Sequence, residues 1–160
     1  MTEAILSLGS NLGDRLLFLQ SAIKKIGEIS GIELIEVSSF YETKPWGVSE
    51  QQNRYLNCCL KIKTKLDPFS LLECCLKVES DLGRTRPYKF APRTIDIDVI
   101  AYGNLVVNEE NLIIPHPRFK QRAFVLIPMG ELCHDGSFYG IEFSDALKSC
   151  NRAEVSKLKQ

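Results

Sequence analysis

Two aspartates, Asp96 and Asp98, stand one residue apart in the segment TIDIDVI, whose other residues are typical of a buried strand. Because residues i and i+2 of a strand share a face, both carboxylates are expected on one face, opposite Ile95, Ile97 and Val99. Two carboxylates this close repel each other unless a cation lies between them. The pair therefore indicates Mg²⁺, which usually takes one or two carboxylates together with substrate phosphates. The alternative is a solvated strand face with incidental acids, although aspartate disfavours strands.

A basic loop precedes this pair and carries Arg84, Arg86, Lys89 and Arg93. Arginine binds phosphate with a planar, bidentate fork, and lysine adds a point charge. Arginine and lysine side chains beside a metal-binding acid pair are expected where an anion lies between the basic and the acidic groups. A nucleotide polyphosphate is the natural candidate for this anion. The glycine and proline residues of this loop also favour a lid that closes over phosphates. A solvated charged loop is the alternative.

A histidine between two prolines, His116, lies in a second basic segment, IPHPRFKQRAF. The prolines restrict the backbone on both sides and hold this residue rather rigidly. We expect the imidazole to donate a hydrogen bond to a phosphate oxygen. A structural turn histidine is the alternative.

The composition predicts one ordinary domain over residues 1–160. The 160 residues are 44% hydrophobic, enough for a real core. The 20 basic and 20 acidic residues balance, so neither nucleic acid nor a membrane surface is expected as a partner. No signal peptide or apolar run of about 20 residues is visible, which favours a cytoplasmic location. We expect a monomer that acts on small molecules.

The six cysteines do not have the spacing of a metal site. Four of them form adjacent pairs, Cys58-Cys59 and Cys74-Cys75, whereas Cys133 and Cys150 are single. Neighbours on a strand or helix point apart, unlike a paired metal-ligand knuckle. Reduced and mostly buried thiols are expected.

Apolar periodicity and breaker residues predict an alternation of strands and helices. The expected strands cover residues 4–10, 32–41, 55–64 and 94–103. Gly9 and Asn11 are expected to break the first strand. Asp14 is the expected cap of the first helix, and Asp67-Pro68 the start of the second. Gly27 or Gly31 and then Gly83 are the expected helix ends.

Three later features are less regular. A polar loop is expected between the second and third strands, over residues 42–54. Gly103-Asn104 predicts a hairpin that brings residues 105–107 back along the preceding strand. Residues 113–132 form a mixed segment, and a short helix is expected over 145–149.

The order β-α-β-β-α-β is typical of the ferredoxin-like α+β fold, an antiparallel sheet with helices packed on one face. That arrangement leaves the other face for ligands, with catalytic loops over the active site. In the third strand, alternation puts Tyr55 and Asn57 on the face opposite Leu56 and Leu60. Both polar residues could then reach one flat ligand.

Several motifs together resemble the 6-hydroxymethyl-7,8-dihydropterin pyrophosphokinase family: SLGSNLGDR, SSFYETKPWG, YLNCCL, APRTIDIDVIAYG and IPHPR followed by an arginine and a phenylalanine. The similarity runs over about residues 4–132. It implies a folate-pathway enzyme that transfers the β,γ-pyrophosphoryl group of ATP to a pterin hydroxymethyl, giving AMP and the pterin diphosphate. Direct in-line attack on the β-phosphorus is the implied mechanism.

The resemblance implies catalytic roles for the acidic pair and three arginines. Asp96 and Asp98 are the implied ligands of two Mg²⁺ ions, which hold the ATP phosphates and the acceptor hydroxyl. Arg93 is implied to contact phosphate and pterin. Arg84 and Arg86 match lid arginines that follow the transferring group.

Further roles are implied at the nucleotide. His116 and Arg122 match residues of the ATP site, and Glu79 lies near the nucleotide in the family pattern. Pro117 stands where an aromatic residue can occur, and Phe90-Ala91 replaces the Trp-Gly of many members in a lid loop about one residue shorter.

The implied pterin pocket has aromatic walls and a polar edge. Tyr55 and Phe124 match the rings that sandwich the pterin, which suits a flat heterocycle. Asn57 matches the amide that reads the polar edge, since it offers a donor and an acceptor together. The main chain around Thr43 and Trp46 is implied to complete the pocket.

Two other functions remain open at this point. A nucleotidyltransferase of the polymerase-beta type also pairs Gly-Ser with D-x-D, but Gly9-Ser10 lies far from Asp96 in this sequence. A ferredoxin-like module without catalytic activity would leave the clustered arginines and aspartates unexplained.

Overall fold

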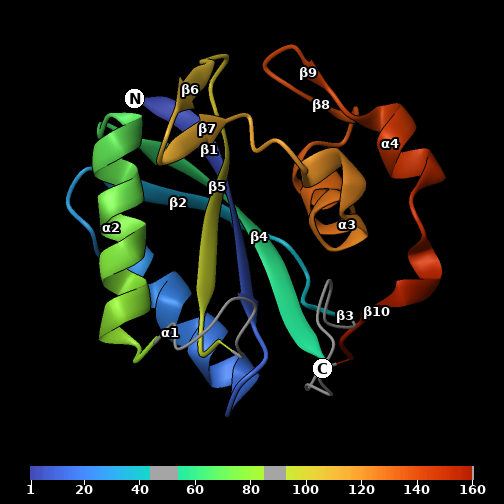
Figure 1. Ribbon diagram of the computed structural model, residues 1–160, viewed down its shortest axis with the longest axis horizontal. Coiled ribbons are helices and arrows are strands. Elements are labelled where there is room, and N and C mark those ends of the chain that lie inside the picture. Colours follow the sequence, from blue (N-terminus) through green and yellow to red (C-terminus); the bar gives the residue numbers. More distant parts are fainter. Residues whose placement is uncertain (44–53, 85–92, 160) are drawn as a thin grey trace.

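The computed structural model describes residues 1–43, 54–84 and 93–159. Within these ranges six strands form one antiparallel sheet in the order β10-β3-β4-β1-β5, with β2 also paired to β4 (Figure 1). The strands are β1 (Thr2–Ser10), β2 (Ile32–Val37), β3 (Tyr41–Thr43), β4 (Tyr55–Thr64), β5 (Asp96–Tyr102) and β10 (Val155–Lys157). The central order β5-β1-β4-β2 confirms the predicted ferredoxin-like core.

Two long helices cover one face of the sheet, and both begin where the sequence predicts. They are α1 (Arg15–Gly27) and α2 (Pro68–Asp81). The Asp14 carboxylate accepts a hydrogen bond from the Leu17 amide at 3.1 Å, and that of Asp67 accepts from the Phe69 and Ser70 amides. These bonds satisfy amides that the first helical turn leaves free. The main core lies between these helices and the sheet and includes Leu6, Leu8, Leu19, Leu60 and Leu71.

The single strand expected over residues 32–41 is two strands, β2 and β3. The break falls at Ser38, which takes part in the ladder with its side chain. The Ser38 amide donates to the Cys59 carbonyl at 3.0 Å, and the Ser38 Oγ accepts from the Cys59 amide at 2.9 Å. A hydroxyl thus replaces a backbone carbonyl, so the chain can turn while β4 stays paired with both strands.

The predicted hairpin partner of β5 is wrong. Gly103 does make a turn, with φ 51°, but β6 (Val107–Glu109) pairs with β7 (Leu112–Ile114) instead of with β5. The outer edge of β5 already has other partners. The Ile97 amide donates to the Glu79 carboxylate at 2.7 Å, and the Ile100 carbonyl accepts from the His116 amide at 2.8 Å.

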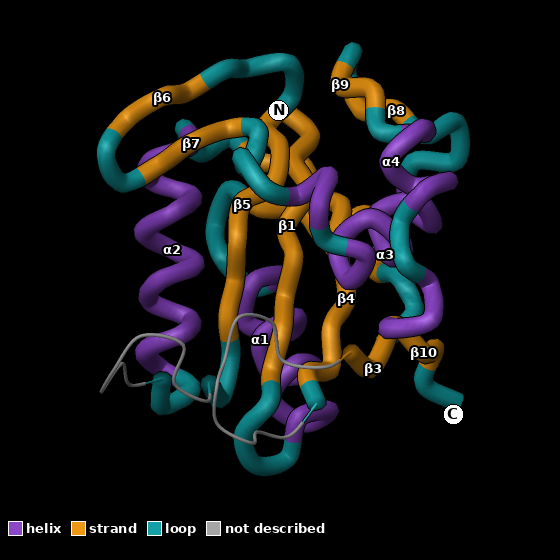
Figure 2. Tube along the Cα trace, turned by 45° about the vertical axis from the view of Figure 1, so that its right-hand side comes forward, coloured by secondary structure: helices purple, strands orange, loops and turns teal. Residues whose placement is uncertain are grey.

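The second face of the sheet is divided into two halves. Helix α3 (Ala123–Leu132) covers one half, where Ile5, Cys59 and Ile100 form a second apolar core with it. Figure 2 shows α3 on the side of the sheet away from α1 and α2. From the sequence we predicted that only ligands and loops would lie on this face. The presence of α3 there differs from that prediction. The half that no described helix covers carries the candidate site.

Short elements complete the described chain. They are β8 (Ser137–Phe138), β9 (Ile141–Glu142), the predicted short helix as α4 (Ser144–Ser149), and the 3₁₀ helices η1 (Phe119–Gln121) and η2 (Arg152–Glu154). Within the described ranges no helix combines the length and apolar character that a membrane span requires.

The cysteines are mostly buried, as predicted. All six are free thiols, and those of Cys58, Cys59, Cys75 and Cys133 are buried. Burial raises the pKa of Cys75 to about 12 and that of Cys133 to about 11. These thiols therefore stay protonated at neutral pH and pack as small apolar groups.

Candidate active site

Strand register brings the predicted polar residues into two rows on the uncovered half of the sheet. Gly9 of β1 pairs with Asn57 on one side and with Asp96 on the other. In the next row Ser7 pairs with Cys59 and with Asp98. Side chains that are far apart in the sequence thus share one surface, because antiparallel pairing aligns them across three strands.

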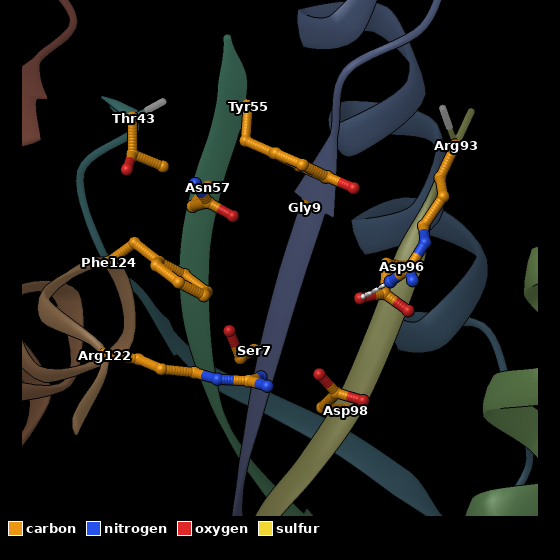
Figure 3. A pocket seen from close by; sticks show the side chains of 10 residues that line it. All are labelled: Ser7, Gly9, Thr43, Tyr55, Asn57, Arg93, Asp96, Asp98, Arg122 and Phe124. Carbon is orange, nitrogen blue, oxygen red and sulfur yellow. Dashed lines mark hydrogen bonds and ion pairs between the residues drawn. The ribbon is translucent and has the colours of Figure 1, made fainter. Parts of the chain in front are cut away.

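A pocket occupies this surface (Figure 3). Its lining residues come from four strands, the start of α3 and the segment before β5, and they are Ser7, Gly9, Thr43, Tyr55, Asn57, Arg93, Asp96, Asp98, Arg122 and Phe124. All of them except Ser7 and Gly9 were predicted as site residues from the sequence. Trp46 and Arg86, which were also predicted, lie outside the described residues.

The two aspartates differ in their electrostatic surroundings. Asp96 accepts hydrogen bonds from Arg84 Nη1 at 2.8 Å and from Arg93 Nη1 at 2.9 Å. Burial, together with the negative charge of Asp96, raises the pKa of Asp98 to about 7, against the opposite effect of Arg122. A divalent cation would stabilise the charged form of both carboxylates. Two hard oxygen donors on one strand face, one of them poorly compensated, therefore fit Mg²⁺.

Arg84 and Glu79 lie beside the pocket at the outer edge of β5. The Arg84 side chain is only 6% exposed and joins Asp96 to Glu79, whose carboxylate is 2.7 Å from Arg84 Nη1. Glu79 itself is buried on α2. Arg84 thus links the buried carboxylate of Glu79 to Asp96, a candidate metal ligand, by two ion pairs.

Asn57 lies between the two aromatic residues of the pocket, Tyr55 and Phe124 (Figure 3). It is 3% exposed, and among the described residues its Nδ2 has no hydrogen-bond partner. An unsatisfied buried amide is costly, so a polar ligand edge at this position would stabilise it. The arrangement suits a planar heterocycle held between rings and read by an amide.

Gly9 is a site residue that the sequence analysis missed. The expected strand break at Gly9 is wrong, since β1 continues through Ser10. A Cβ at Gly9 would lie 2.6 Å from Asn57 Oδ1 and 3.4 Å from Tyr55 Cδ1. Glycine thus provides the space in which the Asn57 amide lies. The sequence did contain a clue to the role of Gly9: strand alternation puts it on the same face of the sheet as the polar residues of β4.

Glu131 is a second missed residue, and it joins two walls of the pocket. The Tyr41 hydroxyl donates to Glu131 Oε2, and the Ser39 amide donates to Oε1 at 2.8 Å. Tyr41 begins β3, which carries Thr43, whereas Glu131 belongs to α3, which carries Phe124. Burial and the Glu131 charge raise the pKa of Tyr41, so its proton stays available for this bond.

Replacing Tyr41 with phenylalanine should lower the free energy of unfolding by about 1.5–3 kcal/mol, the usual contribution of a hydrogen bond to a charged group. Urea denaturation monitored by circular dichroism measures this loss. Tyr139→Phe is the matched control, because Tyr139 makes a similar bond to Glu3 on the exposed surface. Equal losses in both variants would contradict a special role for the partly buried Tyr41–Glu131 pair.

His116 lies on the far side of Asp98 from the aromatic pocket. A second hollow there is lined by Asp98, His116, Pro117 and residues of the β6–β7 hairpin. The His116 Nδ1 accepts a hydrogen bond from the Arg118 amide at 3.2 Å, which leaves the proton of the neutral ring on Nε2. Burial, assisted by the positive charge of Arg122, lowers the pKa of His116 to about 4. At pH 7 the ring is therefore a neutral donor.

The His116 ring should titrate in NMR spectra with a midpoint near pH 4. Since the ordinary histidine pKa is about 6.5, the unfolded chain binds this proton at a higher pH than the folded chain does. Falling pH between these two values should therefore destabilise the wild type more than His116→Gln. Identical pH dependence of the melting temperature in both proteins would contradict a buried, neutral His116.

Comparisons with known proteins give consistent matches. The sequence model of 7,8-dihydro-6-hydroxymethylpterin-pyrophosphokinase (HPPK) matches residues 5–134. A 2-amino-4-hydroxy-6-hydroxymethyldihydropteridine pyrophosphokinase of Bacillus subtilis is 43% identical over 130 residues, which are 81% of this chain and 77% of the relative. One of the same name from Methylorubrum extorquens is 39% identical over 159 residues, 99% of this chain and 100% of the relative.

Solved structures support the fold alone. An HPPK-DHPS in complex with substrates superposes with a TM-score of 0.70 at 13% identity over 92% of this chain. Wild-type HPPK-DHPS of Plasmodium falciparum superposes with a TM-score of 0.67 at 15% identity, again over 92%. The chain spans 43% of the length of each of these two proteins.

Proposed function

The chain belongs to the 7,8-dihydro-6-hydroxymethylpterin-pyrophosphokinase family, and we infer that it transfers the β,γ-pyrophosphoryl group of ATP to the hydroxymethyl of 6-hydroxymethyl-7,8-dihydropterin. The products are AMP and the pterin diphosphate, and the reaction belongs to folate biosynthesis. One structural observation supports this reaction above all others. Asp98 is shared by the aromatic pocket and by the hollow at His116, so an acidic pair stands between two candidate substrate sites.

We place the pterin in the aromatic pocket. Tyr55 and Phe124 would stack on the two faces of the ring, and Asn57 would pair with its amide edge. Thr43 lines this pocket, and Trp46, which lies outside the described residues, is proposed to contribute as the family resemblance implies. The Asn57 Nδ2 has no partner within the described part of the chain, and this supports the assignment because a pterin carbonyl can provide one.

The nucleotide is proposed to bind across Asp98 from the pterin. His116, as a neutral donor through Nε2, would bind a phosphate oxygen without a change of charge. Arg122 extends from the start of α3 towards Asp98 in Figure 3, so it can neutralise phosphate between the two sites. Arg93 lines the pocket next to Asp96 and would contact both substrates. Glu79 was predicted near the nucleotide; because it is buried, we propose a different role for it below.

Asp96 and Asp98 are proposed to hold two Mg²⁺ ions. When bound, these ions would neutralise phosphate charge and polarise the transferring group. In the structure Arg84 and Arg93 form ion pairs with Asp96. Binding of Mg²⁺ to Asp96 would release the two guanidinium groups, which could then bind the phosphates. Arg86 is proposed to act beside Arg84 on the transferring group.

The reaction is proposed to be a direct attack of the pterin hydroxymethyl oxygen on the β-phosphorus, with AMP as the leaving group. The chain contributes mainly by holding both substrates on one rigid sheet and by surrounding the phosphates with cations. Neither Cys58 nor Cys59 can act as a nucleophile here, because both thiols are fully buried with raised pKa values.

We propose that the protein works as a cytoplasmic monomer on small molecules, without a nucleic acid or membrane partner. The balanced charge of 20 basic and 20 acidic residues supports the absence of a nucleic acid or membrane partner. Size-exclusion chromatography with light scattering tests the monomer: a particle mass of twice 18.1 kDa would overturn it.

One assay tests the proposed function. Purified protein should convert ATP and 6-hydroxymethyl-7,8-dihydropterin into equal amounts of AMP and pterin diphosphate, and a chelator should abolish the reaction until Mg²⁺ is restored. Inorganic pyrophosphate with a nucleotidylated acceptor would instead indicate a nucleotidyltransferase. Absence of ATP conversion with any acceptor would indicate a binding module.

A further inference from the structure

The Glu79 carboxylate is almost completely buried, with a side chain that is 4% exposed. A buried charge is costly unless hydrogen bonds and an opposite charge compensate it. Glu79 has both kinds of partner: the Ile97 amide at 2.7 Å and Arg84 Nη1 at 2.7 Å. Both partners belong to the proposed catalytic region, so the groups that compensate the buried Glu79 charge are parts of the site.

The first partner fixes the strand that carries the aspartates. Ile97 stands between Asp96 and Asp98, and β5 is the last strand on its side of the six-stranded sheet. Among the described residues no strand pairs with the outer edge of β5 in that sheet, and the Glu79 carboxylate accepts from the outward Ile97 amide in place of one. A shift of β5 by one residue would move both aspartates to the opposite face. The bond from α2 therefore holds β5 where the aspartates face the pocket.

The second partner is an arginine that Glu79 shares with the acidic pair. Arg84 Nη1 lies 2.7 Å from Glu79 and 2.8 Å from Asp96 Oδ1. An ion that binds Asp96 would compete with this guanidinium for the same oxygen. Both contacts use the same Nη1, so displacement of Asp96 would leave this nitrogen to Glu79, whose carboxylate is also held by the Ile97 amide.

We propose that Glu79 is a positioning residue that holds the Asp96–Asp98 strand and Arg84 together and does not contact ATP. The expected effect of Glu79 on turnover rests on the proposed function. In the free protein Arg84 bridges Glu79 and Asp96; with both substrates bound, Arg84 keeps Glu79 and turns towards the phosphates. Glu79 thus sets the orientation of Arg84 without touching a reacting atom.

Glu79→Gln tests the link to Arg84, because glutamine keeps an oxygen for the Ile97 amide but loses the charge. We expect kcat to fall about 20-fold, as for one lost charge-assisted hydrogen bond, while the Kd of a nonhydrolysable ATP analogue changes less than about 3-fold. In an Arg84→Ala background the same substitution should have almost no effect. Glu73→Gln, an exposed acid on α2, is the control. A large loss of analogue affinity, or an undiminished effect without Arg84, would overturn the proposal.

Hydrogen exchange of the Ile97 amide tests the first link in the unaltered protein and requires no turnover. We expect slow exchange in the free protein and equally slow exchange with the ATP analogue and Mg²⁺. Faster exchange in the complex would mean that Glu79 leaves Ile97 for the nucleotide, which contradicts the proposal. If the protein lacks pyrophosphokinase activity, the kinetic test fails for the wild type as well, whereas slow exchange of the free protein is still expected.

Discussion

Asp98→Ala should lower kcat at least about 1,000-fold, which corresponds to a loss of about 4 kcal/mol of transition-state stabilisation. The substitution removes one of the two carboxylates proposed to hold Mg²⁺, and a single remaining acid cannot keep both ions in place. The fold should be retained, because Asp98 is a partly exposed residue of the pocket lining and not part of either apolar core. Steady-state measurement of AMP and pterin diphosphate determines the loss.

Two further measurements make this prediction specific. Glu33→Ala removes an exposed strand carboxylate far from the pocket and should leave kcat unchanged. Titration with Mn²⁺ and a nonhydrolysable ATP analogue should show weaker metal binding for Asp98→Ala than for the wild type. Near-normal turnover of the folded variant would show that the metal assignment is wrong.

Gly9→Ala should weaken pterin binding about 100-fold, near the upper range for one overpacked methyl group. The new Cβ would lie 2.6 Å from Asn57 Oδ1. Because that oxygen is the end of a side chain, Asn57 can rotate away, so the fold should survive while the amide loses its place. Titration with the pterin by intrinsic fluorescence or calorimetry measures the effect.

The matched control is Gly27→Ala, at the end of α1. An added Cβ there meets only Leu34 Cβ at 3.9 Å, an ordinary contact. Nucleotide-analogue affinity should stay within about 3-fold of wild type in both variants, since a single added methyl acts only on its own neighbours. Unchanged pterin affinity in Gly9→Ala would contradict the location of the pterin beside Asn57.

Local chemistry explains which parts of the fold could be predicted. Asp14 and Asp67 act as helix caps within a few residues, and alternation assigns Asn57 and Asp96 to faces without knowledge of the partners. These signals depend on neighbours in the chain. Both long helices, and Tyr55, Asn57, Asp96 and Asp98 of the pocket lining, therefore agree with the structure, whereas Thr43, Arg122 and Phe124 were implied only by the family resemblance.

Features that depend on distant partners could not be predicted. Helix α3 contains Pro128 and is apolar on nearly all sides, so it has no clear helical periodicity, and its position follows from Val125 and Met129 packing on the second core. The break at Ser38 depends on a hydroxyl bonded to β4. Glu131 joins segments that are ninety residues apart. In each case the deciding contact is tertiary.

The cross-strand row through Asn57, Gly9 and Asp96 also limits which acceptors the enzyme can use. Hydrogen-bonded strands stand about 4.8 Å apart, so two intervals put the backbone of Asn57 about 10 Å from that of Asp96. Backbone bonding sets this length, and no side-chain exchange alters it. Substitutions at Tyr55 or Phe124, the positions proposed to bind the ring, should therefore change which heterocycle is accepted. The distance between the heterocycle and the alcohol oxygen is set by the sheet. An analogue with a longer chain between ring and hydroxyl should therefore bind tightly, but its oxygen would be out of line for transfer.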